Sequence, residues 1–126
     1  MSTPLKTSLR ILIVEDVLMV ASMVQEIVSK LGYEVVGPAG DQPSANSLID
    51  TTPIDAALIS ASLMSAAEDS AVNHLIARGI PFALITGYSD PLDYSYGQIP
   101  ILPKPFTGFQ MSVLIENLFG NGIGKN

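Results

Sequence analysis

The chain has 126 residues, of which 48% are hydrophobic and 14% charged, and this composition excludes a disordered chain. It has no cysteine, which excludes a disulfide framework and a thiolate metal site. Its formal net charge of −6 disfavours DNA binding, because an acidic surface repels phosphate backbones. No apolar run approaches the length of a membrane span, and Met1–Leu9 lacks the apolar core of a signal peptide, so we expect one cytoplasmic, soluble domain that binds no membrane.

The first half of the chain alternates short apolar runs with segments of helical spacing. The run from Arg10 is continuous and rich in β-branched residues, which is typical of a strand covered on both faces. Apolar residues then recur at helical spacing until Gly32, a common helix stop. The pattern predicts strands at Arg10–Val14 and Tyr33–Val36 and helices at Val17–Leu31 and Asp41–Ile49. Gly37-Pro38 is expected to end the second strand.

The second half continues the alternation but contains two irregular stretches. Small and polar residues fill 60–67, and glycine and proline interrupt 86–98, so we expect a loop in the first and a loop or broken short helix in the second. Thr107 and Gln110 have the spacing of a capping box, which predicts a last helix that ends at Gly120. The strands predicted in this half are Asp55–Ile59, Pro81–Ile85 and Ile99–Leu102. The segment Glu68–Arg78 is predicted as a helix.

Strands that alternate with helices in this way predict an α/β domain with a doubly wound, five-stranded parallel sheet and helices on both faces. We assign residues 9–119 to this single domain and expect 1–8 and 120–126 to be flexible tails. In open parallel sheets, functional groups gather at the carboxyl ends of the strands. The residues that follow each predicted strand are therefore the first candidates for a site.

Three short motifs follow predicted strands and carry polar side chains. Glu15 and Asp16 come after the first strand; two adjacent carboxylates could hold Mg²⁺, although such a pair is more often a solvated helix start. Thr86 and Gly87 come after the fourth strand, where a hydroxyl could donate to an oxyanion and glycine leaves room for it. Lys104 follows the fifth strand and could pair with a phosphate oxygen. Each motif alone is weak, but their order along one sheet edge is more specific.

Together, the motifs VED, ITGY and LPKPF and the strand DAALI resemble the receiver domain of bacterial response regulators, over about Leu9 to Leu118. The segment GIPFALITGYSD resembles the subgroup nicknamed FAT GUY receivers. The resemblance implies a flavodoxin-like sheet with the strand order 2-1-3-4-5. It also implies a role in two-component phosphorelay signalling, in which a histidine kinase passes a phosphoryl group to an aspartate beside Mg²⁺.

The sequence departs from the receiver pattern at the position that accepts the phosphoryl group. In receivers the third strand ends in an aspartate, whereas here DAALI is followed by Ser60. A neutral hydroxyl is a poor nucleophile without a base, and the missing carboxylate should weaken Mg²⁺ binding by Glu15 and Asp16. Ile101 also replaces the aromatic switch residue of many receivers. Tyr88 is a candidate to move instead, although a plain loop aromatic is the simpler interpretation.

The sequence leaves three functions open. The first is a non-enzymatic pseudo-receiver that acts through contacts with a sensor histidine kinase or another signalling protein. The second is a working receiver phosphorylated at Ser60 or at Asp69, which a phosphotransfer assay would distinguish. The third is a flavodoxin-like cofactor binder, which Glu15 and Asp16 disfavour because they would repel its phosphate, and which an absorbance spectrum would reveal. The sequence predicts neither the oligomeric state nor the output.

Three further residues have ordinary interpretations. His74 has no companion histidine, so we expect a surface or filler residue of its helix. Met19 and Met23 lie four positions apart, on one face of the first predicted helix. They could mark a partner-binding stripe, but ordinary packing is the simpler expectation.

Overall fold

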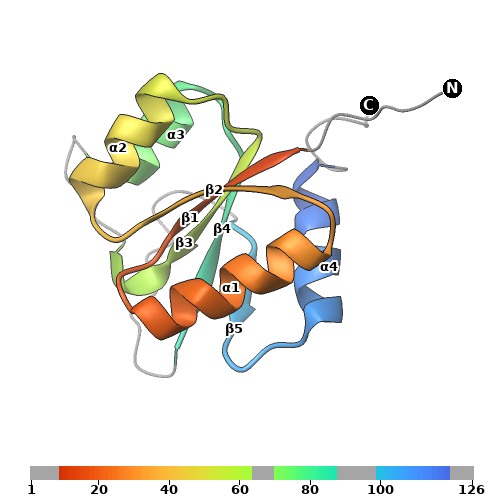
Figure 1. The fold of residues 1–126 in the computed structure, drawn as a ribbon. Coiled ribbons are helices and arrows are strands. Elements are labelled where there is room, and N and C mark those ends of the chain that lie inside the picture. The colour runs from red at the N-terminus through yellow and green to blue at the C-terminus, as the bar shows by residue number, and fades with distance from the viewer. Residues whose placement is uncertain (1–8, 64–69, 88–98, 120–126) are drawn as a thin grey trace, which may run out of the picture.

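The chain folds into a five-stranded parallel sheet that is covered by helices on both faces (Figure 1). The computed structural model describes residues 9–63, 70–87 and 99–119. The strands are β1 Arg10–Val14, β2 Glu34–Ala39, β3 Ala56–Ser60, β4 Phe82–Thr86 and β5 Ile101–Pro103. They are ordered β2-β1-β3-β4-β5, and every neighbouring pair is parallel, which confirms the flavodoxin-like order implied by the sequence.

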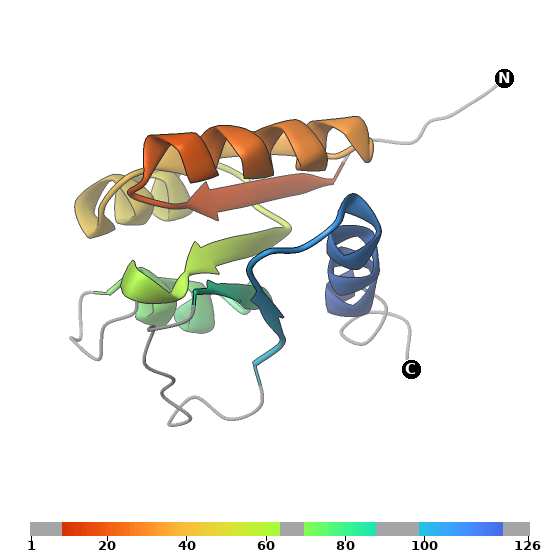
Figure 2. The ribbon, with the colours of Figure 1, turned by 90° about the horizontal axis from the view of Figure 1, so that it is seen from below.

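Helices cover the sheet in pairs within the described ranges. They are α1 Leu18–Lys30, α2 Gln42–Thr51, the 3₁₀ turn η1 Ala61–Leu63, α3 Ala71–Ala77 and α4 Gly108–Phe119. The helices α1 and α4 lie against one face of the sheet, and α2 and α3 lie against the other (Figures 1 and 2). The prediction of a doubly wound α/β fold is therefore confirmed.

The sheet divides the core into two layers, because successive strand residues point to opposite faces. In β1, Ile11 and Ile13 belong to the core layer under α1 and α4, whereas Leu12 and Val14 belong to the layer under α2 and α3. All four side chains are buried. Burying a side chain of this size contributes about 1.5–3 kcal/mol of transfer free energy. Burial on both faces explains why the central strands are continuous apolar runs.

Side-chain caps help to fix where α2 and α4 begin. Gln110 donates its backbone N–H to Thr107 Oγ1 at 3.1 Å, and Thr107 donates its own to Gln110 Oε1 at 2.8 Å, so the capping box predicted for the last helix is confirmed. Asp41 precedes α2 and accepts the N–H of Ser44 at 2.8 Å. This hydrogen bond holds the pKa of the Asp41 carboxyl below its usual range.

β3 and β4 each end one residue later than predicted. Ser60 and Thr86, which the pattern placed just after their strands, are the last residues of β3 and β4. The ladders extend to them because Ser60 pairs with Ile85 and Thr86 pairs with Pro103. Both polar side chains are buried at the strand ends.

The prediction that Gly37 and Pro38 end the second strand is wrong. β2 continues through them to Ala39, with a shift in its register against β1. Gly37 has a φ of +89°, which residues with a Cβ rarely adopt. A Cβ there would lie 2.8 Å from the backbone N of Ala39 and 3.2 Å from the carbonyl O of Ile13. Glycine therefore allows the strand to pass close to its neighbour and continue.

Some predicted features lie outside the described residues. They are the tails 1–8 and 120–126, the first part of the helix predicted from Glu68, and the irregular segment 88–98 with Tyr88. Within the part of the chain that the structure describes, no helix has both the length and the apolar character that a bilayer span requires.

We predict that Gly37→Ala lowers stability much more than Gly32→Ala. Both glycines have positive φ, +89° and +98°, so each alanine carries about 1–2 kcal/mol of backbone strain. Only at Gly37 does the new methyl group also collide with backbone atoms, at an additional cost of about 1–3 kcal/mol. Urea denaturation of the two variants measures the difference, and equal losses of stability would contradict the described path of β2.

Candidate functional site

Four strands end side by side and bring the predicted site residues to one edge of the sheet. β1, β3, β4 and β5 are consecutive neighbours and run parallel, so their carboxyl ends share this edge. The polar residues at these ends are Glu15 after β1, Ser60 in β3, Thr86 in β4 and Lys104 after β5. The sheet topology thus brings these four residues to the same edge of the sheet, as expected from the order of the motifs.

Glu15 is a buried acid, with only 4% of its surface exposed, and is not a solvated helix start. Its Oε2 accepts the N–H of Val17 at 3.0 Å and so satisfies a backbone donor at the beginning of α1. Its Oε1 is buried and has no hydrogen-bond partner. Lys104 Nζ lies 4.0 Å from this oxygen, which is within ion-pair range but too far for a hydrogen bond. Asp16, the second acid of the motif, is exposed.

Ser60 is a buried, neutral group at the centre of the edge. Only 2% of its surface is exposed, and its Oγ lies 2.9 Å from the Oγ of Ser62 in the following 3₁₀ turn. The hydroxyl therefore has a hydrogen-bond partner inside the protein. Either hydroxyl can be the donor in this pair.

The oxygen atoms at this edge fit only a weakly held Mg²⁺. Glu15 has one carboxylate oxygen without a hydrogen bond, and Asp16 has an exposed carboxylate. Within residues 9–63, 70–87 and 99–119, no three His, Cys, Asp or Glu side chains gather closely enough to hold a metal. Affinity for such a hard cation falls as the number of charged oxygen ligands falls.

Thr86 and Lys104 lie beside a mostly apolar pocket. The carbonyl O of Thr86 accepts the backbone N–H of Lys104 at 2.8 Å, which joins the end of β4 to the segment after β5. The pocket has a volume of about 420 Å³ and is lined by Met23, Gly87, Lys104, Pro105 and Phe106. It lies between α1 and the segment that leads from β5 to α4.

Of the two positions considered for a switch, Tyr88 and Ile101, the structure describes the second. Tyr88 is outside the described residues. Ile101, which takes the switch position in β5, is half-buried and packs against the core layer under α2 and α3.

The exposed side of α1 carries an apolar surface next to the pocket. Leu18 and Met19 are 82% and 84% exposed, and Val17 and Met23 are also exposed. The expectation of ordinary packing for Met19 and Met23 is therefore wrong. We call these four residues the α1 patch. It begins directly after Glu15 and Asp16 in the chain, and Met23 belongs both to the patch and to the pocket wall.

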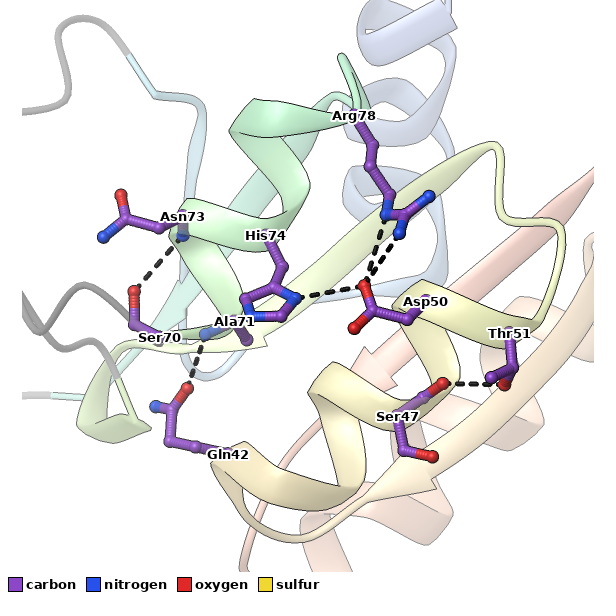
Figure 3. A network of polar contacts seen from close by, with 9 residues as sticks. All are labelled: Gln42, Ser47, Asp50, Thr51, Ser70, Ala71, Asn73, His74 and Arg78. Atoms are coloured by element: carbon purple, nitrogen blue, oxygen red, sulfur yellow. Dashed lines mark hydrogen bonds and ion pairs between the residues drawn. The ribbon is translucent and has the colours of Figure 1, made fainter.

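On the opposite face of the sheet, one side chain holds both ends of the connection between η1 and α3. Gln42, the first residue of α2, accepts the N–H of Ala71 on its Oε1 at 2.7 Å (Figure 3). Its Nε2 donates to the carbonyl O of Leu63. Sequence analysis did not identify Gln42, since a polar residue at the start of a helix gives no signal of a distant contact.

The other end of α2 is also tied to α3 (Figure 3). Asp50 Oδ1 lies 3.1 Å from His74 Nδ1, and Arg78 contacts the same oxygen through Nη2 at 3.1 Å and Nε at 3.2 Å. These contacts, that of His74 first, hold the pKa of the Asp50 carboxyl below its usual range. His74 lies near the surface, as expected, with 23% of its side chain exposed, but it is more than a filler residue because it takes part in a specific contact between helices.

Comparison with known proteins supports the fold. No family model matches the sequence, and no curated protein sequence matches it. SdrG from Sphingomonas melonis Fr1 has a similar structure, with a TM-score of 0.78 and 28% identity over 91% of this chain and 99% of that one. A CheY-like response regulator receiver domain protein from Methanospirillum hungatei JF-1 matches with a TM-score of 0.74 and 21% identity, over 92% and 97% of the two chains.

A third similar structure contains a metal ion. The receiver domain of the sensor histidine kinase PA1611 from Pseudomonas aeruginosa PAO1, with magnesium coordinated in its active-site cleft, matches with a TM-score of 0.71 and 22% identity. The match covers 90% of this chain and 99% of that domain. The chain therefore has the fold of response-regulator receiver domains, as its sequence resemblance implies.

We predict that Asp50→Asn lowers the melting temperature at neutral pH and that this loss shrinks in acid. The folded-state pKa of Asp50 lies below its unfolded value, so its contribution is fully present above the ordinary pKa of an aspartate and is lost as the pH falls through the folded pKa. Thermal melts of both proteins at neutral pH and at about pH 3 measure the effect. The control is Ser47→Ala, because the Thr51 hydroxyl donates its hydrogen bond to the backbone carbonyl of Ser47, which the substitution retains. A loss that is independent of pH would contradict the assigned ion pairs.

Proposed function

We propose that this chain is a receiver-like binding module of two-component signalling that accepts no phosphoryl group and has no catalytic activity of its own. The observation that carries the proposal is Ser60, which is buried at the end of β3 where receivers have their acceptor aspartate. The fold shared with receiver domains supports the signalling context. The net charge of −6 supports action through proteins and not through DNA, in the cytoplasm where receivers meet their kinases.

The surroundings of Ser60 argue against its use as a nucleophile. A serine hydroxyl attacks phosphorus only when a base removes its proton. Its Oγ is paired with Ser62, and the buried acid at this edge, Glu15, uses one oxygen to hold the start of α1. The carboxylate that makes an aspartate an acceptor at neutral pH is absent from this position.

Glu15 and Asp16 would hold Mg²⁺ if it binds, and Thr86 and Lys104 would face an anion at the same edge. A bound Mg²⁺ would neutralise charge on a phosphoryl group. The described ligands support low affinity, so we do not assign the metal a necessary role.

The α1 patch and the neighbouring pocket form the surface that we assign to a partner. Four exposed apolar residues lie within residues 17–23, at the start of α1, and such groupings mark contact sites. An apolar stripe beside a pocket suits a partner helix that lays its own apolar face against α1. A sensor histidine kinase or another helical signalling protein has the appropriate chemistry.

Two other functions have less support. A receiver phosphorylated at Ser60 meets the chemical objections above, and Asp69, the alternative acceptor, lies outside the described residues. A flavodoxin-like cofactor binder would place a phosphate near the buried carboxylate of Glu15, which would repel it. The absorbance spectrum of the purified protein tests the last alternative directly.

We predict that acetyl phosphate and Mg²⁺ leave the mass of the intact protein unchanged, whereas the variant Ser60→Asp gains the mass of one phosphoryl group. The variant restores a carboxylate next to Glu15 and Lys104 and serves as the matched positive control. Peptide mapping locates any modification. A phosphoryl group on Ser60 of the parent protein in stoichiometric amount would disprove the pseudo-receiver proposal.

We also predict that Leu18→Ser and Met19→Ser each change the free energy of unfolding by less than about 0.5 kcal/mol. Their side chains are exposed, so the fold does not depend on them. Val24→Ser, on the fully buried side of the same helix, should cost more than about 2 kcal/mol. Chemical denaturation measures all three. Losses of similar size at Leu18 and Val24 would mean that the α1 patch serves folding and not a partner.

A further inference from the structure

We propose that Met19 and Met23 form a reversible oxidation site, through which hydroperoxides weaken the contact between the chain and its partner. The proposal deepens the proposed function by naming a chemical regulation of the α1 patch, and it rests on that function only for the effect on a partner. The oxidation itself is a property of the two side chains and is tested on this protein alone.

Methionine provides the sulfur chemistry of this chain, because the chain has five methionines and no cysteine. Three of the methionines lie in the described ranges, and their exposure differs widely. Met19 is 84% exposed and Met23 is 42% exposed, whereas Met111 is fully buried in the core layer under α1 and α4. An oxidant must reach the sulfur atom to react with it. Peroxides should therefore oxidise Met19 and Met23 and spare Met111.

Both accessible methionines belong to the surface that we assign to a partner. They lie four positions apart on one face of α1, away from its buried side chains. Met23 also lines the mostly apolar pocket, together with Pro105 and Phe106. The other members of the α1 patch, Val17 and Leu18, have hydrocarbon side chains that peroxides do not attack. One reaction can thus change the polarity of half of the patch and leave the buried side of the helix intact.

The reaction at each sulfur is a two-electron oxidation. A lone pair of the thioether attacks one oxygen of the hydroperoxide, the O–O bond breaks and an S–O bond forms. The proton on the transferred oxygen passes to the leaving oxygen, which departs as water or as an alcohol. The sulfur is oxidised to a sulfoxide and the peroxide is reduced. Sulfoxide reductases reverse the step, because two thiols supply the electrons and become a disulfide while the oxygen leaves as water.

The sulfoxide changes what the α1 patch can bind. It is polar and chiral, whereas the thioether is flexible and apolar. A partner helix that packs its apolar face against α1 would have to cover the new S–O dipoles without hydrogen bonds, and burying a polar group in this way is unfavourable. Oxidation should therefore weaken the contact while the fold stays unchanged, because neither side chain belongs to the core layers.

The first test measures which sulfur atoms react when the folded protein is treated with dilute hydrogen peroxide. Peptide mapping by mass spectrometry should show Met19 and Met23 gaining one oxygen each at least about tenfold faster than Met111. In protein unfolded by urea the three rates should become similar, because burial no longer protects Met111. Equal rates for Met111 and Met23 in the folded protein would overturn the proposal.

The second test measures the apolar surface of the folded protein by its retention on a phenyl column. The oxidised protein should elute earlier than the reduced one, and the variant Met19→Gln/Met23→Gln should elute near it, because the amide is also polar. The matched control is Met19→Leu/Met23→Leu, which keeps the patch apolar without sulfur and should not respond to peroxide. Retention that oxidation leaves unchanged, or that shifts equally in the leucine variant, would speak against the site.

The third test is reversal. Dithiothreitol and methionine sulfoxide reductases specific for each of the two sulfoxide epimers should restore the mass and the retention of the oxidised protein. A sulfoxide that persists at Met19 or Met23 would rule out a reversible site. None of these results depends on Ser60. A phosphoryl group on Ser60 would disprove the proposed function and leave the oxidation site intact, whereas unselective oxidation would overturn this proposal alone.

Discussion

Helices on both faces of a parallel sheet remove water from every central strand position. Backbone groups then pair within the sheet, and the side chains between the layers are apolar, since an unpaired polar group there is strongly destabilising. Polar side chains are left to the strand ends. Three of the four buried polar residues in the described chain, Glu15, Ser60 and Thr86, lie at the carboxyl ends of β1, β3 and β4, and the fourth, Ser70, caps α3. The position of the site thus follows from the way the core is built.

Features that depend on neighbours in the chain could be predicted from the sequence. The continuous apolar strands, the alternation with helices and the capping box of Thr107 and Gln110 each reflect local chemistry, and the structure confirms them. The motifs after the strands indicated which residues share an edge, because a parallel sheet brings together ends that are remote in sequence.

Features that depend on remote contacts could not be predicted in this way. The burial of Glu15 arises from packing at the sheet edge, and the contact of His74 with Asp50 requires α2 and α3 to lie side by side. Met19 and Met23 lie four positions apart, but α1 buries the side that carries Ala21, Val24 and Val28, which leaves Met19 in solvent. Gly37 reads as a strand end, and only the close backbone of β1 explains why a strand continues through it.

The two hydrogen bonds of Gln42 tie the end of η1 and the start of α3 to one side chain of α2. The carbonyl of Leu63 and the N–H of Ala71 are both held by this side chain, so the residues that flank 64–70 are anchored to a third element. Ser70 has a further role, because its Oγ accepts the N–H of Asn73 and caps α3. Residues 64–69 are therefore the natural place in the fold to vary a surface, or to insert a reporter peptide, while Ser60 and the first turn of α3 keep their anchor.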